Sequence, residues 1–278
     1  MARGVTPRRP SRSGRHERPR LPRPVARTGK PSARTEKRTP GPPQPRPRAA
    51  KSAAAAISPE RIAELLRRLD AAYPAATCAL HHRSAWELLV ATILSAQCTD
   101  VRVNMVTPEL FRKYPTPAAF AALGPEQLEP DIRSTGFFRN KAKSLVGAAQ
   151  RLLQDFRGQV PQTMEELLTL PGVARKTANV VLGTWFKKNE GVVVDTHVQR
   201  ISRRLELTRE EDPKKIEQDL MRLIPRGKWT DFSHQIIWHG RKTCVARKPK
   251  CAECPLEDLC HAADKTWSTV PLHSAAKP

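Results

Sequence analysis

The feature that most constrains the fold is residues 163–197, which read as two helices joined by a tight turn and followed by a short extended segment. Thr163 and Glu166 have the spacing of a capping box, which predicts a helix beginning there. The Pro-Gly pair at 171–172 ends that helix. A second helix is predicted from about Arg175. Its apolar face, spaced at i, i+3, i+4 and i+7, consists of Ala178, Val181, Leu182 and Trp185.

The start of this second helix is a candidate anion site. The turn leaves the backbone N–H groups of residues 171–175 free at a helix N-terminus, and Arg175 and Lys176 stand beside them. In a strongly basic chain, a DNA phosphate is the obvious anion. A Pro-Gly turn between two helices is by itself weak evidence for DNA binding, so further motifs are needed.

The positive charge is unevenly distributed. Of the formal net charge of +22, residues 1–50 contribute +13, with 15 Lys+Arg against 2 Glu, and they hold 11 of the 26 prolines. Such a segment buries too little apolar surface to offset its ordering entropy, so residues 1–56 are predicted to be a disordered basic tail. It could be an arm that raises nonspecific DNA affinity, an organelle transit peptide or a tail without a role. We favour the arm, because the prolines oppose the amphipathic helix of a transit peptide.

The rest of the chain is predicted to be all-α, because helical periodicity recurs and no alternating strand pattern is found. Ser58 and Pro59 predict one helix start, and Ser84 predicts another. The helix after Ser84 is apolar nearly all round, so we expect it to be a buried centre. No apolar run approaches the ~18 residues that span a bilayer. With no signal peptide evident, we expect a protein of the cytoplasm that does not bind membranes.

Four of the six cysteines lie within seventeen residues as C-x6-C-x2-C-x5-C, namely Cys244, Cys251, Cys254 and Cys260. This density favours a metal or cluster site over a disulfide framework. Spacing alone leaves Zn²⁺ and a [4Fe–4S] cluster equally open. A basic loop that could face DNA lies between the first two cysteines and contains Arg247, Lys248 and Lys250.

Lys176 and Asp195 are the candidate catalytic residues. Their ordinary interpretations are a solvated surface lysine and a helix N-cap. A helix N-terminus and the neighbouring Arg175, however, both disfavour an ammonium charge and would free the amine of Lys176 as a nucleophile. A carboxylate fixed opposite could stabilise a sugar cation during glycosidic cleavage.

Three motifs together resemble the endonuclease III family of helix–hairpin–helix DNA glycosylases: L-P-G-V-x-x-K-T-A, VDTH eighteen residues on, and the cysteine spacing. The resemblance covers about residues 57–265 and implies a structural [4Fe–4S] cluster on the four cysteines. It also implies two helical lobes. A six-helix barrel at 78–189 would include the hairpin at 163–187, and a cluster lobe would combine 57–77 with 190–268, before a short tail at 269–278.

The resemblance further implies a bifunctional base-excision enzyme. It would act as an N-glycosylase on oxidised pyrimidines, with Asp195 stabilising the sugar cation. It would also act as an AP lyase through a Schiff base on Lys176, leading to β-elimination. The partner would be double-stranded DNA with a damaged base or abasic site, bound by a bacterial, nucleoid-associated monomer.

Several residues would contact this DNA if the resemblance extends to its motifs. Gln97, in LSAQxTD, would fill the space left by the flipped base, although such a cluster at a helix end is more often capping and surface. Phe137 would be the wedge in the base stack. Phosphates would meet Arg139 and Lys141, and at the hairpin Gly172, Ala174, Arg175 and Thr177. Ala174 stands where the family often has Gly, and we expect it to be helical.

Two alternatives remain at this point. A monofunctional mismatch glycosylase is the alternative enzyme, but such relatives replace the lysine that is present here as Lys176. A non-catalytic DNA-binding iron–sulfur protein is the alternative from another class, and the intact Lys176 and Asp195 argue against it.

Overall fold

The computed structural model describes residues 57–272, which lie within the compact unit Ala53–Pro278. The predicted tail at 1–56, and the part of the 269–278 tail after residue 272, lie outside the described residues. Throughout 57–272 the regular structure is helical, as predicted. None of these helices combines the length and apolar character that a membrane span needs.

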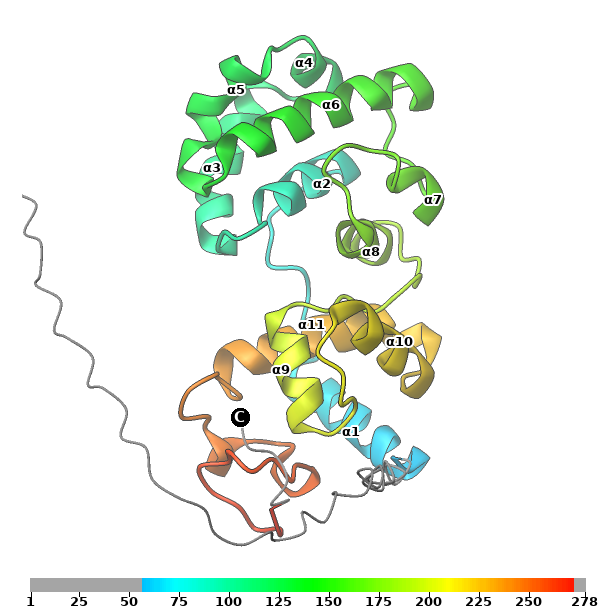
Figure 1. Ribbon diagram of the computed structural model, residues 1–278, viewed down its shortest axis with the longest axis vertical. Coiled ribbons are helices and arrows are strands. Elements are labelled where there is room, and N and C mark those ends of the chain that lie inside the picture. Colours follow the sequence, from blue (N-terminus) through cyan, green and yellow to red (C-terminus); the bar gives the residue numbers. More distant parts are fainter. Residues whose placement is uncertain (1–56, 273–278) are drawn as a thin grey trace, which may run out of the picture. The chain divides into compact units, whose positions relative to one another are not determined.

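Two separate hydrophobic cores organise the described chain, and Figure 1 shows the helices that build each of them. The first belongs to α2–α8 and the second to α1, α9, α10 and α11 together with part of the cysteine segment. The larger helices of the first core are α2 (Ala85–Leu94), α3 (Asp100–Lys113), α5 (Pro125–Ile132), α6 (Phe138–Phe156) and α8 (Arg175–Thr184). Two short helices, α4 (Pro117–Ala121) and α7 (Met164–Leu167), and the 3₁₀ turn η1 (Arg133–Thr135) complete it.

Helix α2 is the buried centre that the sequence predicted. Its side chains from residues 88 to 94 are at most 9% exposed, and Ser84 caps it by accepting a hydrogen bond from the N–H of Glu87. Helices α3, α6 and α8 pack against it. The predicted inward face of α8 is confirmed for Ala178, Val181 and Leu182, whereas Trp185 is 38% exposed and lies outside the core.

The second core joins distant parts of the sequence. Helix α1 (Pro59–Ala72) begins at its predicted cap, Ser58, and packs against α11 (Trp229–Lys242), which also contacts α9 (Thr196–Arg204) and α8. Helix α10 (Pro213–Leu223) contributes Ile216 and Leu220. Three further 3₁₀ turns are η2 (Arg226–Lys228), η3 (Cys251–Glu253) and η4 (Glu257–Leu259). Because α11 contacts helices of both cores, it fixes the two lobes to each other.

Candidate functional site

The hairpin between α7 and α8 depends on Gly172. Its φ is +78°, a region that L side chains rarely adopt, and a Cβ there would lie 2.5 Å from Cβ of Ser144 on α6. The turn is closed by a hydrogen bond from the N–H of Val173 to the carbonyl of Leu170, 3.1 Å. The hairpin is therefore pressed against α6 at a point that only glycine fits.

Helix α8 begins without a side-chain cap. Its N-cap, Ala174, has φ −100° and ψ 169°, so the expectation of helical angles there was wrong. The extended conformation is the usual one for an N-cap and carries no strain. Because alanine has no acceptor, the side chain of Ala174 cannot satisfy the first-turn N–H groups. Lys176 is exposed and Thr177 half-buried in this first turn.

Arg175 is already paired within the protein. Its Nε donates to both carboxylate oxygens of Glu217 on α10, each at 3.0 Å, and its guanidinium also donates to the carbonyl of Glu190, 3.2 Å. Asn179 donates to the same carboxylate at 2.8 Å. Glu217 is 7% exposed, and it was not identified from the sequence. Its carboxylate ties the start of α8 to the second lobe, so the predicted phosphate contact of Arg175 competes with an internal partner.

Asp195 is the N-cap of α9, as the ordinary interpretation expects. Its Oδ1 accepts hydrogen bonds from the N–H groups of His197 and Val198, both at 2.8 Å. The second carboxylate oxygen, Oδ2, accepts no hydrogen bond from residues 57–272. Asp195 is half-buried and follows the buried segment Val192–Val194. One oxygen therefore fixes the carboxylate in place, and the other is open to a further partner.

Two residues of the predicted DNA-contacting loops have strained backbones. Gln97 has φ +52° and Phe137 has φ +49°, although neither is glycine. Both are exposed, and the Phe137 side chain is 62% exposed although it is large and apolar. Left-handed angles at such residues persist only where the surroundings impose them, and they concentrate at functional sites.

The prediction that Lys141 lies beside a DNA phosphate was wrong. The residue is 5% exposed, and its Nζ donates to the carbonyls of Leu94 and Thr135 at 2.8 and 2.7 Å. The first turn of α6 points this side chain into the lobe, where it bonds main-chain acceptors. Arg139, two residues earlier, is exposed; its guanidinium lies over the Phe138 ring, and its Nε lies 3.9 Å from the carboxylate of Glu129, so a phosphate would share it with this partner.

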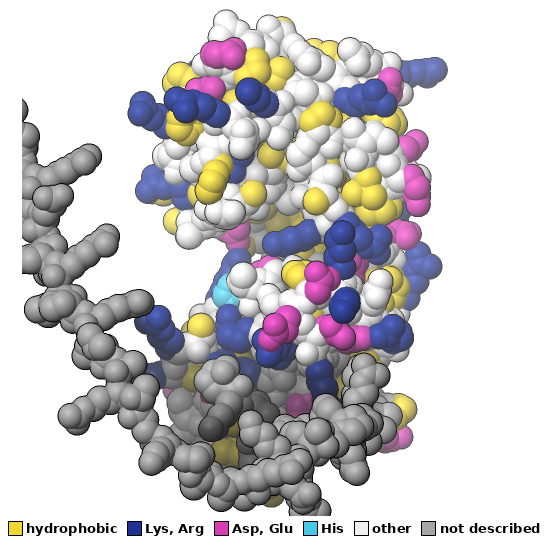
Figure 2. Space-filling model, in the orientation of Figure 1, with side chains coloured by type: hydrophobic (Ala, Val, Ile, Leu, Met, Phe, Trp, Pro, Cys, Tyr) yellow, Lys and Arg dark blue, Asp and Glu magenta, His cyan; other side chains and the backbone are white. Residues whose placement is uncertain are grey.

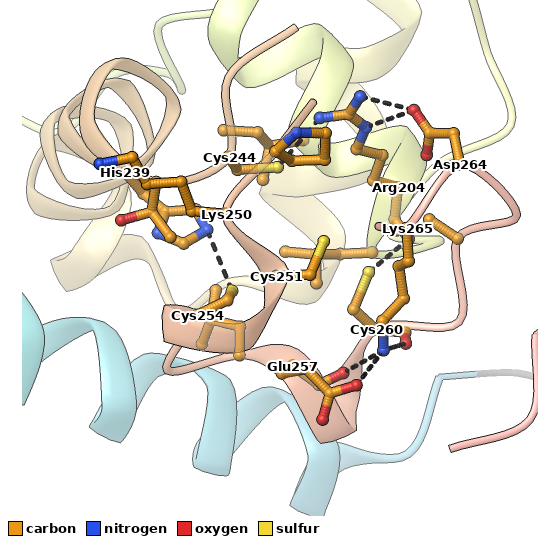
Figure 3. Close-up of a pocket in the computed structure, with 16 residues that line it drawn as sticks. Arg204, His239, Cys244, Lys250, Cys251, Cys254, Glu257, Cys260, Asp264 and Lys265 are labelled. Atoms are coloured by element: carbon orange, nitrogen blue, oxygen red, sulfur yellow. Dashed lines mark hydrogen bonds and ion pairs between the residues drawn. The ribbon is translucent and has the colours of Figure 1, made fainter. Parts of the chain in front are cut away.

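The four cysteines surround one pocket in the second lobe (Figure 3). The four thiols around this pocket are the ligand set that a Cys₄ iron–sulfur cluster requires. Burial raises the pKa of Cys254 to about 12 and that of Cys244 and Cys260 as well, so iron must displace their protons on binding.

Hydrogen-bond donors face these sulfur atoms. Arg204 of α9 donates to Sγ of Cys244 at 3.2 Å, and the N–H of Thr266 donates to Sγ of Cys251 at 3.4 Å. His239 is 1% exposed, and its Nε2 lies 3.7 Å from Sγ of Cys254. Sequence reasoning missed Arg204, which carries no motif of its own. Such donors favour thiolate charge, so the residues present fit a Cys₄ cluster.

Basic residues flank this pocket. The side chains of Arg247, Lys248 and Lys250, predicted to face DNA, are exposed, and Lys248 has a left-handed backbone with φ +54°. Figure 2 shows Lys and Arg side chains on both lobes of the visible face, with the surface hollowed between the lobes. A polyanion lying across both lobes would therefore meet positive charge on each.

Comparison with known proteins identifies the family. Residues 90–226 match the model of the HhH-GPD superfamily base excision DNA repair protein, and residues 244–260 match the iron–sulfur binding domain of endonuclease III. The endonuclease III of Synechocystis sp. is 57% identical over 204 residues, covering 73% of this chain and 93% of that protein. The Bacillus subtilis endonuclease III is 44% identical over 207 residues, covering 74% and 94%.

Comparison with solved structures identifies the same family. A trapped endonuclease III–DNA covalent intermediate is 43% identical with a TM-score of 0.70, and the match covers 73% of this chain and 96% of that one. A non-covalent endonuclease III–DNA complex is 44% identical, also with a TM-score of 0.70, covering 73% and 95%. The chain belongs to the endonuclease III family: it is a base-excision DNA repair enzyme, a DNA glycosylase and AP lyase that carries a [4Fe–4S] cluster.

Proposed function

We propose that Lys176 is the nucleophile of this enzyme and Asp195 the carboxylate that assists it, acting on oxidised pyrimidines in duplex DNA. The amine of Lys176 attacks C1′ of the damaged nucleotide, and the N-glycosidic bond breaks with its electron pair leaving on the base. Asp195 stabilises the positive charge that develops on the sugar through its unengaged Oδ2. The C1′–O4′ bond then opens, with a proton from the amine passing to O4′, and leaves an iminium at C1′. This iminium permits loss of a C2′ proton and expulsion of the 3′ phosphate, which cleaves the strand.

The observation that carries this proposal is the first turn of α8. It presents an exposed lysine directly beside main-chain N–H groups that the side chain of Ala174 cannot cap. A phosphate bound there places the adjacent sugar within reach of a lysine side chain. The covalent endonuclease III–DNA intermediate that resembles this chain supports the same chemistry.

The remaining predicted residues would bind and distort the duplex. Gly172, Ala174 and Thr177 offer hairpin N–H groups to one phosphate, while Arg139, Arg247, Lys248 and Lys250 offer exposed charge to others. Gln97 would fill the space of the extruded nucleotide and Phe137 would enter the stack, since a base cannot react inside the helix. The cluster, once bound, supplies a structural crosslink, because four cysteines leave it no open ligand position.

We also infer that the enzyme acts as a monomer on the chromosome in the bacterial cytoplasm. A single chain contains both candidate catalytic residues, and the similar endonucleases III come from bacteria. Light scattering of the complex with one duplex should give one protein per duplex, and two would overturn this stoichiometry. The basic residues 1–50 would raise nonspecific affinity, and their deletion should then make DNA affinity less dependent on salt.

The decisive experiment is borohydride trapping on duplex DNA with one abasic site. The protein should form a covalent adduct, and Lys176→Gln should form none while binding the same DNA with similar affinity. The exposed Lys143→Gln serves as the matched control and should trap normally. An adduct that survives in Lys176→Gln would assign the nucleophile to another amine.

A further inference from the structure

Lys141 lies where an ammonium group is least expected in this lobe. It is 5% exposed, next to the core residues Ala142 and Leu145, which are fully buried. Burial lowers its pKa, with Cys98 acting in the opposite direction. Burying a cation costs free energy unless its hydrogen bonds are satisfied, so a lysine retained here needs a structural reason.

The two acceptors of Lys141 give that reason, because each lies just before a strained loop residue. Leu94 is the last residue of α2, and three residues later comes Gln97 with φ +52°. Thr135 is the last residue of η1, and two residues later comes Phe137 with φ +49°. The Nζ of Lys141 donates to both carbonyls, at 2.8 and 2.7 Å.

The carbonyl of Leu94 is a favourable partner for a cation. It lies at the C-terminus of α2, where main-chain carbonyls lack intrahelical donors and carry partial negative charge. Thr135 is itself 2% exposed, and its hydroxyl donates to the carbonyl of Ile132, 2.8 Å. Both carbonyls therefore belong to ordered segments. Leu94 precedes Lys141 by 47 residues and Thr135 precedes it by 6, so the ammonium connects two separate parts of the chain.

We propose that Lys141 is a positioning residue that locks the Gln97 turn to the Phe137 loop, so that both side chains enter the duplex as one unit. The inference rests on the proposed roles of Gln97 and Phe137 as filler and wedge. A single rigid unit extrudes a base more effectively than two independent loops, since the ordering of both is complete before DNA binds. Lys141 would thus act on base extrusion without touching DNA.

The test replaces Lys141 with Met, which keeps the apolar stem and removes the donors. Excision of an oxidised pyrimidine from a normal base pair should fall about 10- to 100-fold under single-turnover conditions, the range expected when catalytic elements are misplaced by about 1 Å. The loss should be smaller when the same lesion sits in a mismatch, because less unpairing is needed there. Fluorescence of 2-aminopurine beside the lesion should report reduced extrusion.

Lys143→Met is the matched control, since Lys143 is an exposed lysine two residues further along the same helix. It should leave extrusion and excision unchanged. Combining Lys141→Met with Phe137→Ala should lose less than the two single losses combined, because part of the Lys141 effect passes through the Phe137 loop. If Lys141→Met does not give a folded, cluster-loaded protein, Lys141→Gln keeps two N–H donors on a shorter stem and should show a smaller loss in the same direction.

Trapping separates this inference from the proposed function. Lys141→Met should still form the borohydride adduct on an abasic duplex, where no base has to be extruded. An equal loss on paired and mismatched lesions, or additive losses in the double variant, would overturn the inference while leaving Lys176 assigned. Absence of any adduct from the unaltered protein would instead overturn the proposed function.

Discussion

The consecutive helices α8 and α9 differ in how their N-termini are capped. At α9, Asp195 accepts hydrogen bonds from two first-turn N–H groups, whereas at α8 the N-cap is Ala174, which has no side-chain acceptor. Side-chain caps also close the N-termini of α1, α2, α3, α4, α7 and α10. The α8 start, like those of α5, α6 and α11, lacks the roughly 1 kcal/mol that a side-chain cap contributes, so its first N–H groups are open to another acceptor. At α9 the cap is the carboxylate that we propose as catalytic, so stability and the proposed chemistry would share one side chain.

The largest effect is expected from a substitution that separates the capping role of Asp195 from its proposed catalytic role. Asn caps helices as well as Asp, so Asp195→Asn should keep the unfolding free energy while reducing the single-turnover rate about 10²- to 10³-fold, as when one transition-state contact is removed. Asp195→Ala should show the same loss of rate and, in addition, cost about 1 kcal/mol of stability. Chemical denaturation and single-turnover excision measure the two quantities.

Asp212 provides the control for that experiment. It caps α10 through hydrogen bonds from the N–H groups of Lys214 and Lys215, at 2.9 and 3.1 Å, with no proposed role in chemistry. Asp212→Ala should therefore lose stability and keep its rate. If Asp195→Asn excised bases at the normal rate, Asp195 would be a cap and nothing more.

The next prediction gives α8 the cap that it lacks. Ala174 already has the extended backbone of an N-cap, so Ala174→Asp should stabilise the protein by about 1 kcal/mol. The new carboxylate would occupy the N–H groups and repel a phosphate, so affinity for duplex DNA should fall by about tenfold or more, in line with the cost of juxtaposed like charges. The DNA affinity of Ala174→Ser should lie between that of the unaltered protein and that of Ala174→Asp. Unchanged affinity in Ala174→Asp would mean that the phosphate binds elsewhere.

Another prediction concerns the clamp in which the Glu217 carboxylate accepts hydrogen bonds from Arg175 and Asn179 and so ties the start of α8 to α10. Glu217 binds Arg175 and Asn179 of α8, and a Cβ on Gly191, four residues before Asp195, would overlap this carboxylate. Glu217→Gln should cost about 1–3 kcal/mol, the range for leaving a buried partner unsatisfied. Gly191→Ala should displace the same group. Gly227→Ala, where a Cβ meets nothing within 4 Å, is the control for glycine replacement, and equal stability of both glycine variants would argue against the clamp.

The smallest expected effect concerns a phosphate contact made by a lysine side chain instead of by the N–H groups of a helix N-terminus. Lys250 lies on the exposed cysteine-flanking loop, and Lys250→Gln should reduce the slope of log affinity against log salt by about 1, as for one lost phosphate contact. Lys215→Gln, on the exposed side of α10, should leave the slope unchanged. A slope that stays constant in Lys250→Gln would remove this loop from the DNA interface.

The sequence was informative where structure depends on neighbouring residues. The caps Ser58, Ser84 and Thr163 are confirmed, because a capping side chain bonds an N–H group three residues on. The four cysteines meet around one pocket for a similar reason, since three of them lie within ten residues. All-α class and the buried character of α2 also follow from periodicity alone.

Prediction from the sequence failed where a side chain bonds a partner that is distant in the sequence. Lys141 looks like a surface lysine at the start of a helix, but its acceptor Leu94 is 47 residues away. Arg175 looks like a phosphate ligand, but Glu217 is 42 residues away and no local pattern joins them. Ala174 was expected to be helical because the family glycine drew attention to φ > 0, whereas the structure needs only an extended N-cap.

The two cores also set an order of events during synthesis. Helix α1 leaves the ribosome first, yet its core partners begin only at Val192, so the first core, from Leu80 to Leu182, is complete before α1 can dock. At about 5–20 residues per second, the intervening roughly 120 residues correspond to a wait of about 6–24 s. During this interval the apolar stripe of α1 has no native partner. A ribosome paused just before Val192 would therefore carry a fully synthesised α2–α8 lobe and an undocked first helix.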